Sequence, residues 1–365
     1  MSTGTILVVG ASGFVGAAAV RRLVADGRRV LGVARHAPSI PVAGAEYLQL
    51  DLLDAVACAA AAAKLADVTR VVYAAVNETP GSLVASWTDP DYIVRNGRMF
   101  ANLLDALLPQ AHGLRHICVI HGTKAYAVHR GDEFRKVPLR ESLPRPDNDD
   151  FYFRQEDELR RRAQGQAWSW TVLRAPVIAG GGRDSNLNSV LVIAIFAAIH
   201  KALGIALPFP GARDQQGVVE MVDVDLLAKA IAWSGGAPSA HNQIFNVTNG
   251  DVFSWRDLWP ILADAFGVTV GESQEISLQR FVDDHADTWA QLVERHGLTA
   301  PRDPRRLLGE SCALADFMLY SSGRCSVLTS TIKIRQAGFH ECIDTATSLL
   351  GWIQRWRDDG LLPPR

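Results

Sequence analysis

Near its N-terminus the chain reads TILVVGASGFVG over residues 5–16. The first five of these residues, Thr5 to Val9, are a short apolar run of the kind that forms a strand buried on both faces of a parallel sheet. Three glycines follow at the spacing GxxGxxG, and a helical pattern then continues to about Asp26. A strand, a glycine turn and a helix in this order are the context that a dinucleotide-binding site requires.

Each glycine of this turn has a mechanical role. Gly10 makes the tight turn, Gly13 lets the backbone approach a pyrophosphate, and Gly16 lets the helix pack closely against the strand. The helix N-terminus then presents free N–H groups to the phosphates. Ordinary turns also use glycine, so the flanking strand and helix carry the prediction. We therefore expect a dinucleotide to contact Gly10, Ser12, Gly13, Phe14, Val15 and Gly16.

Further apolar runs predict the rest of a doubly wound parallel sheet. They lie at residues 29–33, 48–51, 70–75 and 116–120, and a long helical pattern covers residues 91–108. Ala74 and Ala75, at the end of one run, are small enough to lie against a cofactor. The sequence therefore predicts an α/β protein of the Rossmann class, with ligands at the carboxyl ends of the strands.

The residues after the second run bear on the choice of cofactor. An acidic side chain there would bind the ribose hydroxyls of NAD, but the chain reads Ala34-Arg35-His36. Arg35 suits the 2′-phosphate of NADPH, because a guanidinium forms paired hydrogen bonds with phosphate oxygens. The alternative is a solvated arginine after a strand. The lack of a neighbouring acid favours NADPH.

Composition restricts the class of protein. Of 365 residues, 48% are hydrophobic and 21% are charged, with a net charge of −2, which is ordinary for a globular protein and argues against a nucleic-acid partner. The N-terminal residues do not resemble a signal peptide, and the longest apolar run, residues 190–199, is about half of a membrane span. Five cysteines without metal-ligand or CxxC spacing fit free thiols in a cytoplasmic protein, with no metal site.

A candidate catalytic pair comes from two separate segments. Asn-Asp-Asp at residues 148–150 is a good helix N-cap, which places Tyr152 in the first turn of a helix. The usual YxxxK lysine is absent, because Glu156 stands four residues after Tyr152. Lys124 lies at the end of the preceding predicted strand and is the natural cation, since a positive charge beside a phenol favours an oxyanion. Taken singly, a packing tyrosine and a surface lysine are the alternatives.

Several segments resemble one family. DFYFRQED at residues 150–157 resembles the FYYxxED signature of the progesterone 5β-reductase and iridoid synthase group, which are atypical extended short-chain dehydrogenases/reductases. GTKAY at 122–126 is similar to their GxKHY, and SWTVLRAP at 169–176 to their SWSVHRP. FNVTNGDVFSW at 245–255 resembles FNCxNGDVFxW, and residues 329–339 resemble the closing SxxKxxxxGF. The likeness spans nearly the whole chain.

The resemblance implies an NADPH-dependent reduction of an activated C=C bond in a small apolar α,β-unsaturated carbonyl compound. Hydride would pass from the nicotinamide to the β-carbon of an enone or enal. Tyr152, assisted by Lys124, would hydrogen-bond the enolate oxygen, where charge develops in the transition state.

The resemblance also implies further cofactor contacts. Asp51, followed by Leu52, stands where relatives contact adenine, although an ordinary loop aspartate is nearly as good an interpretation. Pro176 and Val177 are expected beside the nicotinamide, together with Tyr152 and Lys124. Asn96 is either a support for Lys124 or a plain surface asparagine, and the two interpretations are about even.

The chain departs from the family pattern close to the candidate pair. Phe153 replaces the second tyrosine of the signature, Ala125 replaces the histidine of GxKHY, and Val128-His129 replaces a Gly-Pro. These positions neighbour the catalytic groups, so the size and polarity of the substrate stay open. Neither proposed oxyanion donor is lost.

The predicted organisation has two lobes. Residues 1–176 are expected to form an NADP-binding Rossmann domain. Residues 177–365 are expected to form a smaller, mostly helical substrate lobe, from which a segment at about 218–250 returns to the Rossmann core. A very apolar helix at 186–203 would either wall a substrate pocket or be buried in a lobe interface or a dimer. A homodimer is common on this scaffold.

Two other functions stay open on the sequence. A 1,2-carbonyl reductase or a sugar-nucleotide enzyme would share the glycine turn, but the missing YxxxK argues against both. A cofactor-sensing regulator without turnover would often lose the tyrosine and the lysine, and this chain keeps both.

Overall fold

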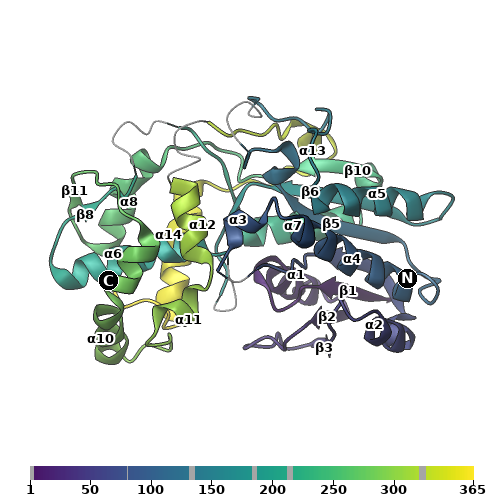
Figure 1. The fold of residues 1–365 in the computed structure, drawn as a ribbon, viewed down its shortest axis with the longest axis horizontal. Helices are drawn as coiled ribbons and strands as arrows, with labels where there is room; N and C mark the ends of the chain where they lie inside the picture. The colour runs from purple at the N-terminus through teal and green to yellow at the C-terminus, as the bar shows by residue number, and fades with distance from the viewer. Residues whose placement is uncertain (1–3, 80, 131–135, 183–186, 212–216, 320–325) are drawn as a thin grey trace.

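The computed structural model describes residues 4–79, 81–130, 136–182, 187–211, 217–319 and 326–365. Its centre is a sheet of seven parallel strands in the order β10-β6-β5-β4-β1-β2-β3 (Figure 1). The strands are β1 (Thr5–Val9), β2 (Val30–Ala34), β3 (Ala45–Gln49), β4 (Val68–Tyr73), β5 (His116–Gly122), β6 (Ser169–Ala175) and β10 (Gln243–Asn246). Strands β1 to β3 run outward in one direction, and β4 then begins on the other side of β1. The strand order therefore reverses between β1 and β4, which is where open α/β sheets bind ligands.

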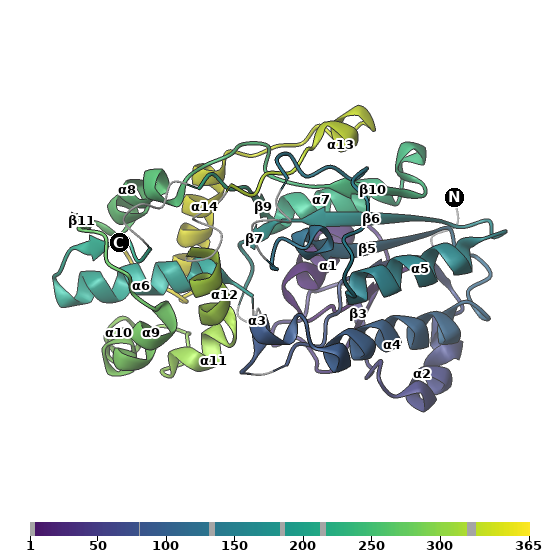
Figure 2. The ribbon, with the colours of Figure 1, turned by 45° about the horizontal axis from the view of Figure 1, so that its top comes forward.

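Helices cover both faces of the sheet (Figure 2). On one face lie α1 (Phe14–Ala25) and α7 (Val224–Ser234), whose side chains form one buried cluster with alternate residues of the strands. On the other face lie α2 (Ala55–Ala61), α4 (Pro90–Leu107) and α5 (Phe151–Ala163). Burial on both faces explains why the strands read as continuous apolar runs.

The later part of the chain forms a helical lobe beside the sheet (Figure 1). It contains α6 (Ser189–Leu203), α8 (Trp255–Phe266), α9 (Leu278–Asp284), α10 (Ala286–His296), α11 (Pro304–Leu308), α12 (Ser311–Phe317) and α14 (Thr345–Asp358). A two-stranded sheet of β7 (Val177–Ala179) and β9 (Met221–Asp223) and another of β8 (Leu207–Pro208) and β11 (Val270–Gly271) complete it, while α3 (Leu83–Ser86) and α13 (Ile332–Gln336) are short. No helix in the described part of the chain is long and apolar enough to cross a membrane.

The predicted fold class is confirmed: a doubly wound parallel sheet is followed by a mostly helical portion. Strand β10, from late in the chain, pairs with β6 at the edge of that sheet. Helices α9 and α10 are separated at His285, whose φ of −115° and ψ of 21° end α9 and whose ring Nδ1 lies 2.9 Å from the carbonyl oxygen of Phe281.

The apolar helix predicted at 186–203 is α6, but it does not wall the cavity described below. Every residue from Ser189 to His200 is buried, and the apolar ones belong to the core that α6 forms with α8, α9, α10, α12 and α14. Among the described residues of this stretch, only Leu187, which precedes the helix, lines the cavity. An all-apolar circumference is typical of a helix surrounded by others.

Candidate active site

The glycine turn lies where the strand order reverses. Gly10 has a φ of 83°, a left-handed conformation that favours glycine, and a Cβ on it would lie 2.8 Å from the carbonyl oxygen of Ala74. A Cβ on Gly16 would collide with the carbonyl oxygen of Gly10. Gly13 precedes α1 without any side-chain hydrogen bond to cap the helix, so the first N–H groups are free for an anion. The turn therefore fits a dinucleotide pyrophosphate.

The end of β2 is tied directly to this turn. The N–H groups of Gly10 and Ala11 both donate to the carbonyl oxygen of Val33, at 2.8 and 3.1 Å. Arg35 follows two residues later, exposed, and has no ion-pair partner among the residues described. Its guanidinium is thus available two residues beyond the strand end that the glycine turn contacts.

The other predicted adenine-side residues are placed less favourably. Asp51 is exposed and its Oδ1 accepts from the N–H of Leu53 at 2.9 Å, an ordinary turn contact. Leu52 is buried, and its side chain packs in the core beneath α4. Ala75 also packs against that core, whereas Ala74 faces the cavity.

A cavity of about 370 Å³ opens at the carboxyl ends of the strands. Of the predicted site residues it is lined by Gly13, Phe14, Val15, Ala74, Lys124, Tyr152, Pro176 and Val177. Gly10, Ser12, Gly16, Arg35, Asp51, Leu52 and Ala75 do not form its wall. Most other lining side chains are apolar, and they include Trp87, Phe151, Phe253, Trp255, Phe317 and Met318. Such a cavity suits an apolar ligand with one polar end.

Tyr152 is held in this wall by the start of α5. Asp150 caps the helix, and its Oδ1 accepts from the N–H of Tyr152 at 2.9 Å. The phenol lies beside Gly122, where an added Cβ would be 3.2 Å from the phenol oxygen. Burial, followed by the negative charges of Asp150 and Glu78, raises the pKa of Tyr152. The phenol is therefore a neutral hydrogen-bond donor.

Lys124 lies in a cage of aromatic rings. It belongs to the 3₁₀ turn η2 (Thr123–Tyr126) that follows β5. Its Nζ lies 4.8 Å from the ring centre of Trp87, 5.0 Å from Phe151, 5.2 Å from Tyr152 and 5.5 Å from Tyr92. Within the described residues it has no hydrogen-bond acceptor. Burial lowers the pKa of Lys124, and the carboxylates of Asp150 and Glu78 oppose that fall.

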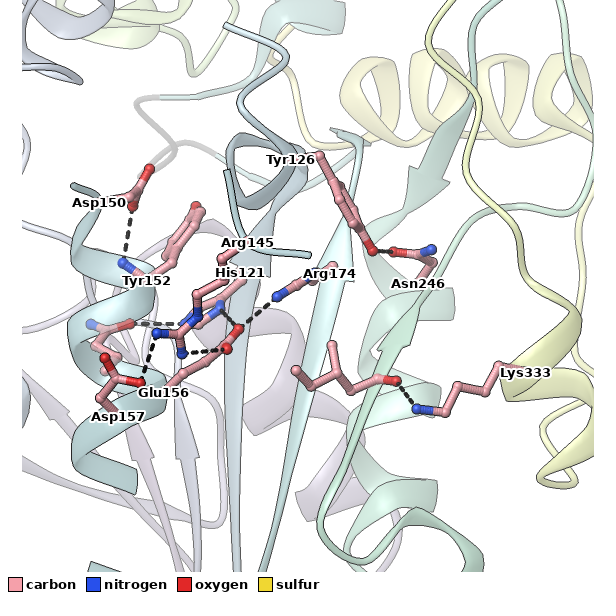
Figure 3. Close-up of polar contacts among 12 residues, drawn as sticks. His121, Tyr126, Arg145, Asp150, Tyr152, Glu156, Asp157, Arg174, Asn246 and Lys333 are labelled. Carbon is pink, nitrogen blue, oxygen red and sulfur yellow. Dashed lines mark hydrogen bonds and ion pairs between the residues drawn. The ribbon is translucent and has the colours of Figure 1, made fainter. Parts of the chain in front are cut away.

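A buried polar network stands behind Tyr152 (Figure 3). The ring of His121 stacks on the phenol ring with centres 4.2 Å apart and planes at 21°. His121 Nε2 lies 3.1 Å from Oε1 of Gln155, and Nδ1 lies 3.7 Å from Oε1 of Glu156. Stacking therefore fixes the plane of the phenol, and the helix that carries Tyr152 also holds the imidazole.

Glu156 is the centre of that network. Its Oε1 accepts from Arg174 at 2.7 Å, and its Oε2 accepts from Arg145 at 3.0 Å. Burial alone would raise the pKa of Glu156, but His121 and Arg174 outweigh it and hold the pKa well below its usual range. The guanidinium of Arg174 in turn covers the ring of Tyr126 at 4.8 Å.

The sequence did not predict the wall that faces Lys124. Glu78 and Trp87 come from the segment between β4 and α4, Tyr92 comes from the first turn of α4, and all three line the cavity. The position of Glu78 just beyond β4 could have indicated it, because ligands bind at the carboxyl ends of strands. Asn96 is not a surface asparagine: it is buried, its Oδ1 accepts from the N–H of Asn77 at 2.7 Å, and it fixes the backbone next to Glu78.

The structure shows which departures from the family pattern lie in the cavity wall. Phe153 and Ala125 are buried, yet neither belongs to the cavity wall. Phe153 instead lies 4.9 Å from the guanidinium of Arg145. Val128 and His129 do line the cavity. Burial lowers the pKa of His129 to about 4, so its imidazole is neutral near pH 7.

Comparisons with known proteins identify the family of the chain. Residues 6–248 match the model of the NAD dependent epimerase/dehydratase family. The chain is 32% identical to (S)-8-oxocitronellyl enol synthase ISY1 of Nepeta racemosa, over 98% of this chain and 92% of that one. It is 29% identical to a 3-oxo-Δ4,5-steroid 5β-reductase of Arabidopsis thaliana, over the same shares of both chains.

Solved structures show the same fold. UDP-glucose 4-epimerase of Thermotoga maritima, determined with UDP-glucose, has a TM-score of 0.67 at 18% identity, over 97% of this chain and 99% of that one. UDP-glucose 4-epimerase of Thermus thermophilus, in complex with NAD, has a TM-score of 0.65 at 21% identity over the same shares. A nicotinamide cofactor follows from the family and the glycine turn. The chain therefore belongs to the NAD dependent epimerase/dehydratase family, as an oxidoreductase of the extended short-chain type in the progesterone 5β-reductase and iridoid synthase group.

Proposed function

We propose that the protein reduces the C=C bond of a small apolar enone or enal with NADPH. The observation that carries the proposal is that Tyr152 and Lys124, from α5 and the end of β5, line one apolar cavity beside the glycine turn. The relatives support a conjugated substrate, since one is named as an enol synthase and another as a reductase of 3-oxo-Δ4,5-steroids, which are enones.

The bound cofactor would supply a hydride. The glycine turn and the start of α1 would hold its pyrophosphate, and Pro176 and Val177 would lie beside its nicotinamide. The neutral phenol of Tyr152 would donate a hydrogen bond to the substrate carbonyl oxygen, and the ammonium of Lys124 would add a positive charge. Both donors act more strongly on an enolate than on a carbonyl, so they lower the barrier.

Arg35 supports NADPH as the cofactor. It is exposed at the end of β2, close to the turn through the hydrogen bonds of Gly10 and Ala11 to Val33. A 2′-phosphate is the group on NADPH that NADH lacks, and a free guanidinium in that place would bind it with charge-assisted hydrogen bonds.

The test is NADPH oxidation with 2-cyclohexenone, progesterone and a linear enal, followed by identification of the product. We expect a saturated carbonyl compound, and we expect Tyr152→Phe and Lys124→Met each to lower kcat/KM by about 10²-fold or more. An allylic alcohol would instead indicate 1,2-reduction. Full activity in both variants would remove the assigned roles of the pair.

A further inference from the structure

Glu78 is a carboxyl group that the reaction described so far does not use. It lies beyond β4, next to Asn77, whose backbone makes two hydrogen bonds with the side chain of Asn96. The N–H of Asn77 donates to Asn96 Oδ1 at 2.7 Å, and Asn96 Nδ2 donates to the carbonyl oxygen of Asn77 at 3.2 Å. The side chain of Glu78 lines the cavity. Its Oε2 accepts from the hydroxyl of Tyr92 at 3.1 Å. Its Oε1 has no hydrogen-bond donor among the described residues.

Tyr92 places this carboxyl group on the same wall as the candidate pair. The Nζ of Lys124 lies 5.5 Å from the centre of the Tyr92 ring, and the hydroxyl of that ring holds Glu78. Lys124 and Glu78 also influence each other electrostatically. The phenol of Tyr152, the ammonium of Lys124 and the carboxyl of Glu78 therefore face one part of the cavity.

Reduction of an enone needs a proton at the α-carbon as well as a hydride at the β-carbon. The α-carbon is only two bonds from the carbonyl oxygen, so its proton donor must stand close to the groups that bind that oxygen. We infer that Glu78 is the catalytic acid that protonates the α-carbon, an assignment that rests on the proposed function.

The step balances in atoms and electrons. After hydride has reached the β-carbon, the electron pair of the enolate forms a C–H bond at the α-carbon with the proton from Oε1 of Glu78. The carbonyl double bond is restored, and Glu78 is left as a carboxylate. The hydroxyl of Tyr92 and the charge of Lys124 stabilise this carboxylate, and water then returns the proton.

The other acidic or titratable groups of the site fit this role less well. Asp150 does not line the cavity: its Oδ1 caps α5, and its Oδ2 is fully buried. Glu220 does line the cavity, but its Oε2 already accepts from both the N–H and the hydroxyl of Thr329, at 2.6 and 2.8 Å. His129 is neutral near pH 7 and has no acidic proton to give.

The protonation behaviour of Glu78 is compatible with an acid. Burial raises its pKa, against the opposing influence of Lys124 and of the Tyr92 hydroxyl. A raised pKa increases the protonated fraction near neutral pH, and Brønsted behaviour favours a proton donor whose pKa is close to the working pH.

The test identifies the face of the enolate at which deuterium is added to the α-carbon. NADPH and 2-methyl-2-cyclohexenone are incubated in D₂O with wild type, Glu78→Gln and the control Glu158→Gln, whose carboxylate lies outside the cavity wall and pairs with Arg162, and the α-deuterated products are resolved by NMR and chiral chromatography. Wild type and the control are expected to deuterate one face. Glu78→Gln keeps an acceptor for Tyr92 but has no acidic proton, so we expect both faces to be deuterated and the protonation step to slow by about 10²-fold, while single-turnover oxidation of NADPH continues.

Deuteration of one face by Glu78→Gln at the wild-type rate would overturn the assignment of Glu78 and leave the proposed function standing. Failure of wild type to oxidise NADPH with any enone would overturn the proposed function and this assignment together. Should Glu78→Gln not fold, Glu78→Asp keeps the acid one methylene shorter. Recovery of single-face deuteration in Glu78→Asp would support the assignment, and deuteration of both faces at the wild-type rate would contradict it.

Discussion

The carboxylate of Glu156 lies 2.7 Å from the guanidinium of Arg174, and both side chains are almost fully buried. Glu156 occupies the position, four residues after Tyr152, where ordinary short-chain dehydrogenases carry the lysine of YxxxK. Here the position serves an ion pair that holds His121 against the phenol ring. In the proposed mechanism the active-site cation is Lys124, and the helical position four residues after Tyr152 has a structural role.

Glu156→Gln is therefore expected to destabilise the protein strongly. Removing one member of a buried ion pair leaves the other charged and unsolvated, which typically costs about 3–5 kcal/mol. Urea unfolding of the two proteins measures the difference. The matched control is Glu158→Gln on the same helix, because Glu158 pairs with Arg161 and Arg162 nearer the surface and such pairs contribute up to about 1 kcal/mol. Equal effects of the two substitutions would contradict the structural role.

Gly122→Ala tests the position of the phenol. The backbone of Gly122, with φ of −116° and ψ of −178°, is open to any residue, but the new methyl group would lie 3.2 Å from the Tyr152 oxygen. A displacement of a reacting group by 1 Å can cost about 10²-fold in rate, so for this smaller shift we expect kcat to fall by about tenfold with little change in Tm. Gly113→Ala is the control, since its methyl group would meet Thr69 at an ordinary 3.6 Å. An unchanged kcat in Gly122→Ala would show that the phenol tolerates the crowding.

Arg35→Ala tests the preference for NADPH. Hydrogen bonds to charged groups contribute about 1.5–3 kcal/mol, so the Kd for NADPH should rise by about 10- to 100-fold, while the Kd for NADH should change little. Fluorescence titration with both cofactors at two salt concentrations measures these Kd values. The loss of affinity for NADPH should be larger at low salt, where charges are screened less. An equal loss of affinity for both cofactors would mean that Arg35 does not bind the 2′-phosphate.

The sequence predicts the strands and the glycine turn of this site better than the side chains that line its cavity. Strands buried on both faces produce continuous apolar runs, and the glycine turn requires its own spacing, so β1, α1 and the place of the cofactor follow from local pattern. Lys124 and Tyr152 meet because β5 ends beside α5, a relation that the motifs indicate but do not measure. The position of Glu78 just beyond β4 indicates a ligand site in general terms only. The segment after β4 has no periodicity, and its place near Lys124 depends on the sheet order, in which β4 and β5 are neighbours.

Phe153 shows that a position next to Tyr152 in the sequence does not establish a place in the cavity wall. It directly follows Tyr152, and on the sequence alone its change from the family tyrosine leaves the shape of the substrate site open. Successive residues of an α-helix point about 100° apart, however, and Phe153 packs on Arg145 outside the cavity wall. A residue that neighbours a candidate catalytic residue in the sequence therefore need not contact the substrate.

Glu220 gives a prediction for the dependence of stability on pH. Burial raises its pKa to about 7, although Thr329 donates two hydrogen bonds to it. In the unfolded chain a glutamate has a pKa near 4.3, so between about pH 4.3 and 7 the folded protein holds a proton that the unfolded chain has lost. The contribution of Glu220 to stability therefore falls as pH rises through this window, and the whole penalty is present above pH 7.

Glu220→Gln removes the titrating group and keeps an oxygen that can accept from Thr329. Relative to wild type, the variant should gain stability between pH 5 and pH 8, by about 2–4 kcal/mol at 1.36 kcal/mol for each pKa unit. Urea unfolding at both pH values gives the two differences, and Glu158→Gln, whose carboxylate lies nearer the surface, serves as the control with no such gain. A difference between wild type and Glu220→Gln that does not change with pH would show that Glu220 titrates alike in the folded and unfolded protein.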